Sequence, residues 1–541
     1  MSVTITVNGK EYQAEAGRWL IDVLNEIGMD IPYFCYHPGL GPDGNCRMCQ
    51  VEYVSERGSR LAISCNAQVT EGLNVVTDSQ VVKAARAGVE EFLLLNHPLD
   101  CPICDKSGEC TLQDYYMAHD MKTSRQDFPR FKKKKAIDIG PTMVLDQERC
   151  VLCDRCVRFL RDWAGSEELY IAGRGHDAFL TPFPGKEVTS PYSLNTVDLC
   201  PVGALTSKDF RFSIPTWFLK RTPSVCTSCS RGCAIAVDAK DQTVHRLRPR
   251  HNPDVNGYWM CDAGRLNYKF VNTGRIRCAV VERGGERYEC SLENAVNELR
   301  ALLGIGGGPQ GQERVPVVML ASATCTLEEM YAIKRLTAVL PEASLYAARH
   351  VPDGEQDNLL RRSDRHPNRK GAELLDIPLV DFREGSGEKG AEAIGQVSGE
   401  TVLLAVGFDY GIGGKLEEFF GNFNKVALVA SCESSLTAGA SVLVPGLTFA
   451  EKDGLVVNFQ GHIQKLAPAL DNLWDRTPPW QIIMGLVASV TGENGFDDLT
   501  DLRAALGEQE AAFSAVDLNA VGPFGVRLQE QVVQAPLPSR D

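Results

Sequence analysis

The distribution of cysteine is the feature that most constrains what this chain can fold into. The sequence has 541 residues and 19 cysteines, of which 15 lie in the first 261 residues. These 15 fall into compact groups rather than being evenly scattered. A cytosolic chain keeps its thiols reduced, so clustered cysteines there indicate metal binding or catalysis rather than disulfides. The first half of the chain is therefore expected to be built around metal centres.

Charge and hydropathy exclude several classes of function. The formal net charge of −14 argues against non-specific binding to nucleic acid or to an anionic membrane surface. No run of about 18 uncharged apolar residues is present, so no direct membrane insertion is expected. The opening MSVTITVNGKEYQ lacks the basic and apolar regions of a secretory signal. We expect a cytosolic protein that reaches a membrane only through partners.

The first cysteine group follows a short segment with mixed strand and helix signals. Alternating apolar residues lead into Asn8-Gly9, a hairpin signal, and residues 18–27 have helical periodicity. This order predicts a small β-grasp domain. Four thiolates in a loop suit a [2Fe–2S] cluster, with a structural zinc site as the alternative. Glycines at Gly39, Gly41 and Gly44 would let backbone N–H groups turn toward sulfur. The candidate ligands are Cys35, Cys46, Cys49 and Cys65.

The second group lies in HPLDCPICDKSGEC, directly after a predicted helix. Ser79 is expected to cap that helix, which would run to about Asn96. Its apolar face would comprise Val82, Ala85, Val89 and Leu93. Three cysteines leave a [4Fe–4S] cubane one ligand short, and the upstream histidine can supply an imidazole; a Cys₃His zinc knuckle is the alternative. The candidate ligands are His97, Cys101, Cys104 and Cys110.

The third group carries the most specific motif in the chain. C-x₂-C-x₂-C followed by a distant Cys-Pro is the bacterial ferredoxin signature of a [4Fe–4S] cluster. In two-cluster ferredoxins the last cysteine serves the other cluster, but no second C-x₂-C-x₂-C flanks it in this sequence. The simplest interpretation is that all four cysteines bind a single [4Fe–4S] cubane. The candidate ligands are Cys150, Cys153, Cys156 and Cys200.

The fourth group reads C-x₂-C-x₃-C, with another cysteine 28 positions later. This spacing fits a zinc ribbon, and it is also the spacing of the [4Fe–4S] domain at the front of molybdopterin oxidoreductases. Four unrelated zinc sites would make an unusual scaffold, and zinc has no redox chemistry. A row of iron–sulfur clusters would instead conduct electrons. The candidate ligands are Cys226, Cys229, Cys233 and Cys261.

Beyond residue 275 the ligand spacings stop and an α/β pattern begins. Short apolar runs alternate with a helical segment, which implies strands alternating with helices in layers. The expected strands are Val315–Leu320, Val402–Val406 and Val426–Ala430, and the expected helix is Leu327–Leu340. Residues 304–311 are expected to be a linker, and the run 132–135 of four lysines a solvated loop. The remaining cysteines are expected to be small core residues: Cys278, Cys290, Cys325 and Cys432.

The order of these groups is recognisable. Residues 1 to about 275 resemble the large, 75 kDa-type iron–sulfur subunit of respiratory complex I, the family of NADH-quinone oxidoreductase G subunits. DNLLRRSDRHPNRKGAELL (357–375) and TFAEKDGLVVNFQGHIQ (448–464) are similar to the family's degenerate molybdopterin-oxidoreductase region. The fourth ligand set is absent from many members, mitochondrial ones among them, which suggests a bacterial chain.

The resemblance implies a multidomain fold of α+β and α/β parts. The expected domains are a β-grasp [2Fe–2S] domain (1–78), a His-Cys₃ [4Fe–4S] domain (79–119), a ferredoxin-like [4Fe–4S] domain (137–217), a molybdopterin-oxidoreductase-type [4Fe–4S] domain (219–275) and a shortened, degenerate molybdopterin-oxidoreductase-like α/β region (276–541). One [2Fe–2S] and three [4Fe–4S] clusters are thus expected. The last region is short for a molybdenum enzyme, so no molybdopterin is expected.

The resemblance also implies a function without a substrate site on this chain. Electrons would arrive from an FMN/NADH-binding flavoprotein subunit and a small [2Fe–2S] subunit. They would leave toward the quinone-module subunits of complex I. The chain would lie peripherally on the cytoplasmic side of the inner membrane, held by these partners. The alternatives are an electron-transfer subunit of a soluble NAD-linked hydrogenase or formate dehydrogenase, and a zinc-stapled interaction protein.

Overall fold

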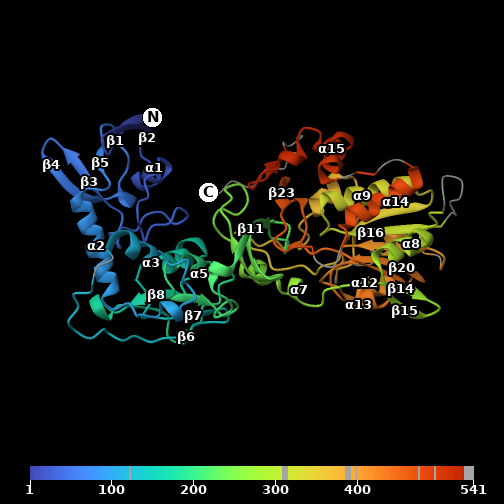
Figure 1. The fold of residues 1–541 in the computed structure, drawn as a ribbon, viewed down its shortest axis with the longest axis horizontal. Coiled ribbons are helices and arrows are strands. Elements are labelled where there is room, and N and C mark those ends of the chain that lie inside the picture. The colour runs from blue at the N-terminus through green and yellow to red at the C-terminus, as the bar shows by residue number, and fades with distance from the viewer. Residues whose placement is uncertain are drawn as a thin grey trace. The chain divides into compact units, whose positions relative to one another are not determined.

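The computed structural model divides the chain into two units, Met1–Leu219 and Lys220–Asp541 (Figure 1). It describes residues 1–120, 123–306, 315–383, 391–395, 397, 399–472, 476–492, 495–496 and 498–528. The predicted linker 304–311 lies outside the described residues from position 307 onward. None of the helices in the described ranges is long and apolar enough to cross a bilayer.

The first unit begins with a five-stranded sheet in the order β2-β1-β5-β3-β4. Its elements are β1 (Ser2–Val7), β2 (Lys10–Glu15), α1 (Leu20–Glu26), β3 (Gln50–Ser55), β4 (Gly58–Ile63) and β5 (Asn74–Val76). The predicted hairpin is confirmed: Val7 pairs with Lys10, and both Asn8 and Gly9 adopt the positive φ that a two-residue turn of this kind requires. The β1–β5 pair is parallel, and the other pairs are antiparallel.

Helix α2 (Gln80–Leu94) follows, and Ser79 caps it as predicted, with its hydroxyl accepting from the N–H of Val82 at 3.2 Å. The predicted apolar face is only partly right. Val82 is buried, but the other three residues of that face are half-buried, and the buried side also carries Arg86 and Glu90. Arg86 donates to the carbonyl of Gln50 at 2.8 Å, so a polar contact with β3 selects which side of the helix faces inward.

The rest of the first unit consists of short elements joined by long loops. They are α3 (Thr111–Tyr115), β6 (Ile137–Asp138), β7 (Met143–Leu145), α4 (Arg155–Arg158), β8 (Leu169–Ala172), β9 (Phe179–Pro182), α5 (Asn195–Leu199) and β10 (Leu205–Ser207). Strands β10, β7 and β6 form one small antiparallel sheet, and β8 pairs with β9. With so little regular structure, the cysteine-bearing loops make up much of this part of the chain.

The second unit opens with the antiparallel sheet β11 (Lys220–Val225), β12 (Ala234–Lys240) and β13 (Thr243–Pro249), followed by α6 (Asp262–Leu266) and α7 (Lys269–Asn272). A second small sheet comes from the far end of the unit: β22 (Gly454–Val457), β23 (His462–Leu466) and β24 (Val526–Arg527). Contacts between β11 and β23 bring these distant stretches together.

An eight-stranded sheet forms the centre of the second unit, in the order β15-β14-β21-β20-β19-β16-β17-β18. Its strands are β14 (Ala279–Arg283), β15 (Glu286–Cys290), β16 (Val317–Ser322), β17 (Ala343–Arg349), β18 (Leu379–Asp381), β19 (Val402–Val406), β20 (Lys425–Ala430) and β21 (Val442–Pro445). The pairs from β18 to β21 are all parallel, while β14 is antiparallel to both β21 and β15. The three predicted strands are confirmed within two residues at each end.

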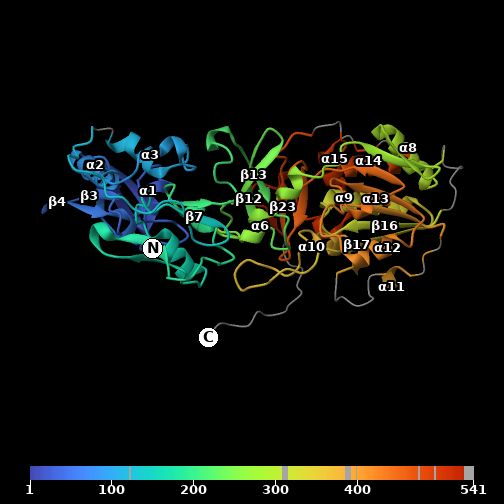
Figure 2. The same cartoon turned by 90° about the horizontal axis from the view of Figure 1, so that it is seen from below.

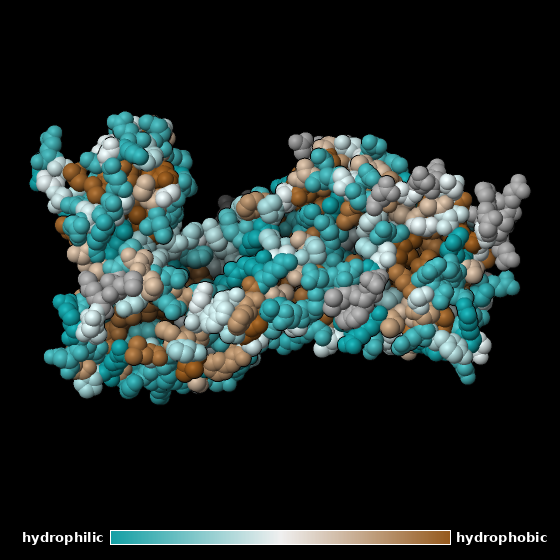
Figure 3. Space-filling model, in the orientation of Figure 1, coloured by the Kyte–Doolittle hydropathy of each residue, from teal (hydrophilic) through white to brown (hydrophobic). Residues whose placement is uncertain are grey.

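Helices cover both faces of this sheet (Figure 2). One face packs against α8 (Leu292–Leu302), α9 (Leu327–Val339), α14 (Pro479–Thr491) and α15 (Leu499–Gln509). The other packs against α12 (Gly414–Phe420) and α13 (Ser435–Ala438). Every residue of β16 and β19 is buried, as expected of strands covered on both sides. Predominantly hydrophilic residues face outward in Figure 3, with smaller apolar patches among them.

Candidate metal centres

The four thiols of the first group lie together, and Cys49 and Cys65 belong to the same apolar core as residues of the five-stranded sheet. Cys35 and Cys65 are fully buried, and the Cys35 thiol makes hydrogen-bonding contacts with the thiols of Cys46 and Cys65. Cys49 contacts Cys65 in the same way, and this contact lowers the pKa of Cys49 to about 7. The four predicted ligands are therefore brought together.

The loop that carries this group is bent toward its sulfurs. Gly41 and Gly44 have φ values of 72° and 80°, the left-handed conformation expected of hinge glycines. Arg47 shares that conformation at 57°, which is rare for a residue with a side chain. The N–H of Phe34 points at the Cys46 sulfur at 3.5 Å. Such N–H groups directed at sulfur are among the features that tune a cluster.

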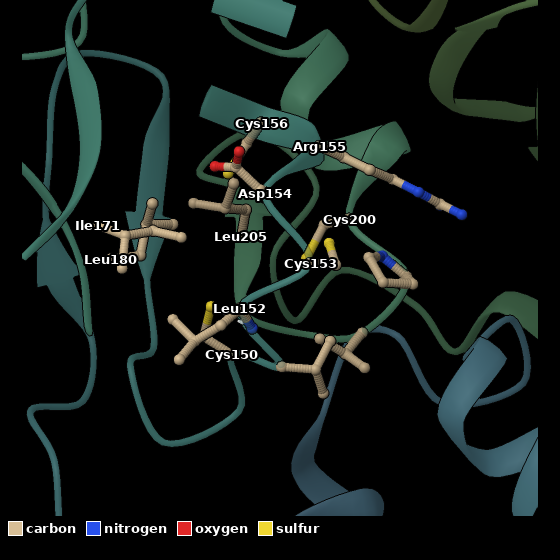
Figure 4. Close-up of a pocket in the computed structure, with 14 residues that line it drawn as sticks. Cys150, Leu152, Cys153, Asp154, Arg155, Cys156, Ile171, Leu180, Cys200 and Leu205 are labelled. Carbon is tan, nitrogen blue, oxygen red and sulfur yellow. Dashed lines mark hydrogen bonds between the residues drawn. The ribbon is translucent and has the colours of Figure 1, made fainter. Parts of the chain in front are cut away.

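The third group surrounds one pocket (Figure 4). All four cysteines line it, and Cys153 and Cys200 lie next to each other. Leu152 and Asp154 both have positive φ, which curls the chain between the cysteines, and the Leu152 N–H is 3.4 Å from the Cys150 sulfur. Burial raises the pKa of Cys150 and of Cys153 to about 12. A bound cluster would therefore have to stabilise the thiolate form of these two residues.

The second group is the most open of the four. His97 lies three residues beyond the end of α2, and burial together with Arg149 lowers its pKa to about 4. The imidazole is thus neutral at pH 7, the form that can ligate a metal. Cys101 is exposed, whereas Cys104 and Cys110 are half-buried, and burial raises the pKa of Cys110 to about 11.

A small charge network beside the second group was not predicted from the sequence. The guanidinium of Arg149, which is buried, donates to the carboxylate of Asp100 at 2.9 Å. Lys135 also binds Asp100, at 2.6 Å, and Glu148 at 2.9 Å. Residues 132–135 form a loop in which Lys135 is exposed, as predicted, and the charge network adds ion pairs that the prediction did not include. The only sequence signal was the position of Asp100 and Arg149 immediately before Cys101 and Cys150.

The second and third groups are in direct contact. A Cβ built on Gly203 would lie 2.2 Å from the Cys104 sulfur, so only a glycine fits there. The N–H of Thr111, next to Cys110, donates to the carbonyl of Pro201 at 2.9 Å. The Cys-Pro-Val-Gly stretch of the third group therefore packs on the loop of the second.

The third group also contacts the first. Arg158 of α4 is buried, and its guanidinium donates to the carbonyls of Cys35, Leu40 and Gly41. Arg155, on the same helix, extends away from the sulfurs in Figure 4 and donates to the Leu199 carbonyl at 3.0 Å. Helix α4 carries Cys156, so the third group lies between the other two within the first unit. These two arginines were not singled out from the sequence.

The fourth group is assembled in the second unit. The N–H of Cys226 donates to the carbonyl of Cys233 at 2.8 Å. Cys261 caps α6, with its sulfur accepting from the Gly264 N–H at 3.3 Å. A Cβ on Gly264 would lie 3.1 Å from the Cys226 sulfur. Burial raises the pKa of Cys226 to about 11 and of Cys261 to about 12.

A segment from the α/β region completes this fourth site. We call residues 357–366 the arginine strap. The Ser230 N–H donates to the carbonyl of Asp364 at 2.9 Å, and Arg231 donates to the carbonyl of Leu359 at 2.8 Å. From another direction, the Phe459 N–H donates to the Ser230 carbonyl at 3.0 Å. Both sequence stretches that resemble the degenerate region thus hold the cysteine loop in place.

The cysteines of the first, third and fourth sets are brought together. Among the described residues no contact joins His97 to the cysteines of the second set, and ligation at all four sets stays a prediction. Within the described ranges, no group of three or more His, Cys, Asp or Glu side chains has the geometry to hold a metal ion. A cluster of several irons needs more room than a single ion. An iron–sulfur cluster fits the pocket that the third group shares and the thiol contacts within the first group. Of the remaining cysteines, Cys325 and Cys432 are buried as predicted, Cys290 is half-buried, and the prediction is wrong for Cys278, which is exposed.

Four family models match the chain in order. They are the 2Fe-2S iron-sulfur cluster binding domain (residues 1–80), the NADH-ubiquinone oxidoreductase-G iron-sulfur binding region (86–125), the NADH-quinone oxidoreductase subunit 3 ferredoxin-like domain (140–206) and the molybdopterin oxidoreductase Fe4S4 domain (219–273). Each contains one of the four predicted ligand sets.

Similar proteins extend the match beyond these models. The NADH-ubiquinone oxidoreductase 75 kDa subunit of Reclinomonas americana is 34% identical over 71% of this chain and 54% of its own length. The mitochondrial 78 kDa subunit of Neurospora crassa is 38% identical over 65% of this chain and 47% of its own. The NADH-quinone oxidoreductase G subunit of Streptomyces coelicolor is 36% identical over 62% of this chain and 39% of its own.

A solved structure is also similar in sequence. A chain of the NAD⁺-reducing [NiFe]-hydrogenase in the H₂-reduced state is 33% identical, covering 40% of this chain and 92% of its own, with a TM-score of 0.36. The chain spans about half the length of the curated relatives it matches. With these homologues and the four iron–sulfur domain models in order, the chain belongs to the family of NADH-quinone oxidoreductase G subunits and mitochondrial 75–78 kDa subunits.

Proposed function

We propose that this chain conducts electrons as the large iron–sulfur subunit of an NADH:quinone oxidoreductase. The observation that carries the proposal is that three cysteine groups touch within one unit. The third group contacts the second at Gly203 and the first at Arg158. Each bound cluster would accept and release one electron. The chain's own residues hold the sites at fixed spacing and supply the ligands, N–H donors and charges around them.

We propose the four predicted ligand sets as the cluster sites, with one [2Fe–2S] cluster in the first and one [4Fe–4S] cluster in each of the others. The β-grasp assignment of residues 1–78 and the further domains at 79–119, 137–217, 219–275 and 276–541 belong to the same proposal. It is supported by the family models and by the five-stranded sheet that holds the first group. No molybdopterin is proposed.

The contacts between sites support an order for the electron path that the sequence could not provide. The third group touches the first through α4 and the second through the Pro201–Gly203 stretch. Electrons entering at the [2Fe–2S] site would therefore pass through the ferredoxin-type site before reaching the His97 site. The exposed Cys101 makes that last site the natural exit to another protein.

The partners follow from the family. The donor would be an FMN/NADH-binding flavoprotein subunit with a small [2Fe–2S] subunit, and the acceptors would be the quinone-module subunits. The chain would be held by them at the cytoplasmic side of the inner membrane. An NAD-linked hydrogenase or a formate dehydrogenase would use a similar first half, so the set of co-purifying subunits discriminates between these assemblies.

The proposal is tested by metal analysis of anaerobically purified protein. One [2Fe–2S] and three [4Fe–4S] centres require about 14 iron atoms per chain, with matching acid-labile sulfide. Stoichiometric zinc with little iron would refute it. Cys200→Ser and Cys153→Ser should remove the same EPR signal because both cysteines line one pocket. If the two substitutions remove different signals, Cys200 and Cys153 do not bind the same cluster.

A further inference from the structure

The arginine strap brings positive charge to the fourth cysteine group. A cavity of about 190 Å³ is lined by Cys229 and Cys261 and also by Arg361, Arg362 and Arg365 of the strap. The strap is held against the cysteine loop by backbone bonds, including Ser230 N–H to the Asp364 carbonyl at 2.9 Å. The arginines therefore face the same space as the predicted ligands.

Two of these arginines are not neutralised by carboxylates. Arg361 pairs with Asp357 at 2.7 Å and with Glu355. By contrast, Arg362 and Arg365 form no ion pair with any residue that the structure describes. Arg362 lies with its guanidinium 3.9 Å from the centre of the Phe459 ring, and Arg365 donates weakly to the Ser228 carbonyl at 3.4 Å.

Arg231 adds a third positive charge from within the cysteine loop. It is fixed by the carbonyls of Leu359 and Leu360, and it also lies over the Phe459 ring at 5.1 Å. Arg231 and Arg362 therefore place two positive charges over the same aromatic ring. Like charges this close repel each other, and a negative charge beside them offsets the repulsion. The nearby thiols, once deprotonated, would supply it.

The strap arginines are close neighbours of the cysteine loop. Arg362, Arg365 and Cys229 line the same cavity, and Arg365 donates to the carbonyl of Ser228, the residue before Cys229. A cation that favours the thiolate also favours any further negative charge placed on the same site, because the attraction acts on charge whatever its source.

We propose that Arg362 and Arg365, assisted by Arg231, raise the midpoint potential of the fourth cluster. Reduction adds one electron, and hence one negative charge, to a site that already carries four thiolates; no covalent bond forms or breaks. The uncompensated guanidiniums stabilise that added charge. The α/β region would then act on this site through charge as well as by holding its loop. This inference rests on the proposed ligation of a [4Fe–4S] cluster by the fourth group.

The test is an EPR-monitored redox titration of the full chain, with dithionite as the electron donor. The signal of the fourth cluster is first identified as the one that Cys229→Ala removes. In the double variant Arg362→Gln/Arg365→Gln, we expect its reduction equilibrium to shift about tenfold toward the oxidised form, which is 59 mV for a one-electron couple. The double lysine variant, which keeps both charges, should stay near the wild-type midpoint.

A matched control is Arg283→Gln, because Arg283 is an exposed arginine of the same unit and pairs with Glu298 on α8. It should leave the midpoint unchanged. If the glutamine variant loses the cluster and the lysine variant retains it, the requirement for positive charge is supported. An unchanged midpoint in the glutamine variant, or loss of the cluster in both variants, overturns the inference. Absence of any signal sensitive to Cys229→Ala in the wild type would instead refute the proposed fourth ligand set.

Discussion

The sulfur of Cys104 lies against the backbone of Gly203, so that a Cβ at Gly203 would be only 2.2 Å away. A neighbouring carbonyl, that of Pro201, accepts from the N–H of Thr111 at 2.9 Å. These two contacts join the loop that follows Cys200 to the loop that carries Cys104 and Cys110. The absence of a side chain at one position therefore sets how closely two of the proposed clusters approach.

Gly203→Ala should disturb the second cluster more than the third. The added methyl group overlaps the Cys104 sulfur, and overpacking of this kind typically costs about 1–3 kcal/mol. We expect a weakened or altered EPR signal from the His97 site, while the third cluster is retained. Gly88→Ala in α2 is a suitable control for the glycine-to-alanine change in the same unit, since Gly88 has no positive φ and a Cβ there meets nothing within 4 Å. Equal effects on both clusters would contradict this prediction.

Arg158→Lys should destabilise the loop of the first group. A lysine cannot reach three carbonyls at once as the forked guanidinium does, and each lost bond to a charged donor is worth about 1.5–3 kcal/mol. We expect a lower thermal stability of the [2Fe–2S] signal. Arg161→Lys is the matched control, because Arg161 is half-exposed and pairs only with the adjacent Asp162 among the described contacts. If both variants behave like the wild type, α4 does not support the first site.

His97→Cys should keep a cubane but lower its midpoint potential. The neutral imidazole gives the cluster one fewer negative charge than a thiolate would, which favours the reduced state, as histidine does in Rieske centres. The pH dependence of the midpoint should also flatten, because the protonatable ligand is gone. His97→Ala should make the cluster labile. Redox titrations at several pH values test this, and an unchanged midpoint in both variants would remove His97 from the ligand set.

Arg503→Leu should strongly destabilise the second unit. Arg503 donates at 2.7 Å to Glu328, whose side chain is fully buried, and at 2.7 Å to Asp453. Removing one partner leaves a buried carboxylate uncompensated, at a cost of about 3–5 kcal/mol. The exposed Arg283→Leu should cost at most about 1 kcal/mol. Denaturant unfolding monitored by circular dichroism would compare the two variants. Similar denaturation midpoints would argue against a structural role for the Arg503 pair.

Stability of the second unit should fall as the pH drops below 6.5. The Nε2 atom of His366 accepts from the N–H groups of His350 and Val351 at 2.9 and 3.1 Å, so the folded imidazole is neutral, with its other nitrogen 2.9 Å from Asp364. Burial lowers the pKa of His366 from 6.5, and it lowers that of His350 to about 3. As the pH falls, the unfolded chain therefore binds protons before the folded chain does. The contribution of His366 and His350 to the free energy of unfolding is fully present above pH 6.5 and is lost progressively toward pH 3.

Thermal unfolding between pH 8 and pH 5 measures this loss. His366→Gln should show a smaller change with pH than the wild type, whereas His176→Gln, at an exposed site, should match it. A melting temperature that is independent of pH in the wild type would refute the prediction. Because His366 ends the arginine strap, its protonation should also loosen the loop over the fourth site.

Much of the fold could be read from local patterns. The Asn8-Gly9 turn needs positive φ at both positions, and Ser79 offers a hydroxyl to an otherwise unpaired helix N–H, so both features are determined within a few residues. Strand β19 matches its predicted bounds because a continuous apolar run buried on both faces has few alternatives. The buried side of α2 was misjudged because Arg86 faces inward only through a bond to Gln50, 36 residues away.

The sequence by itself determined the chemistry of the sites, because ligand type and spacing are local properties of each loop. It could not determine which site touches which, since that depends on contacts between distant residues. Only the tertiary structure brings Cys104 to Gly203, Arg158 to the Cys35 carbonyl and the arginine strap to Cys229. Each of these contacts spans from about 100 to more than 120 positions of sequence, and no periodicity or spacing rule reaches so far. The order of the proposed electron path and the charge around the fourth site are therefore consequences of packing.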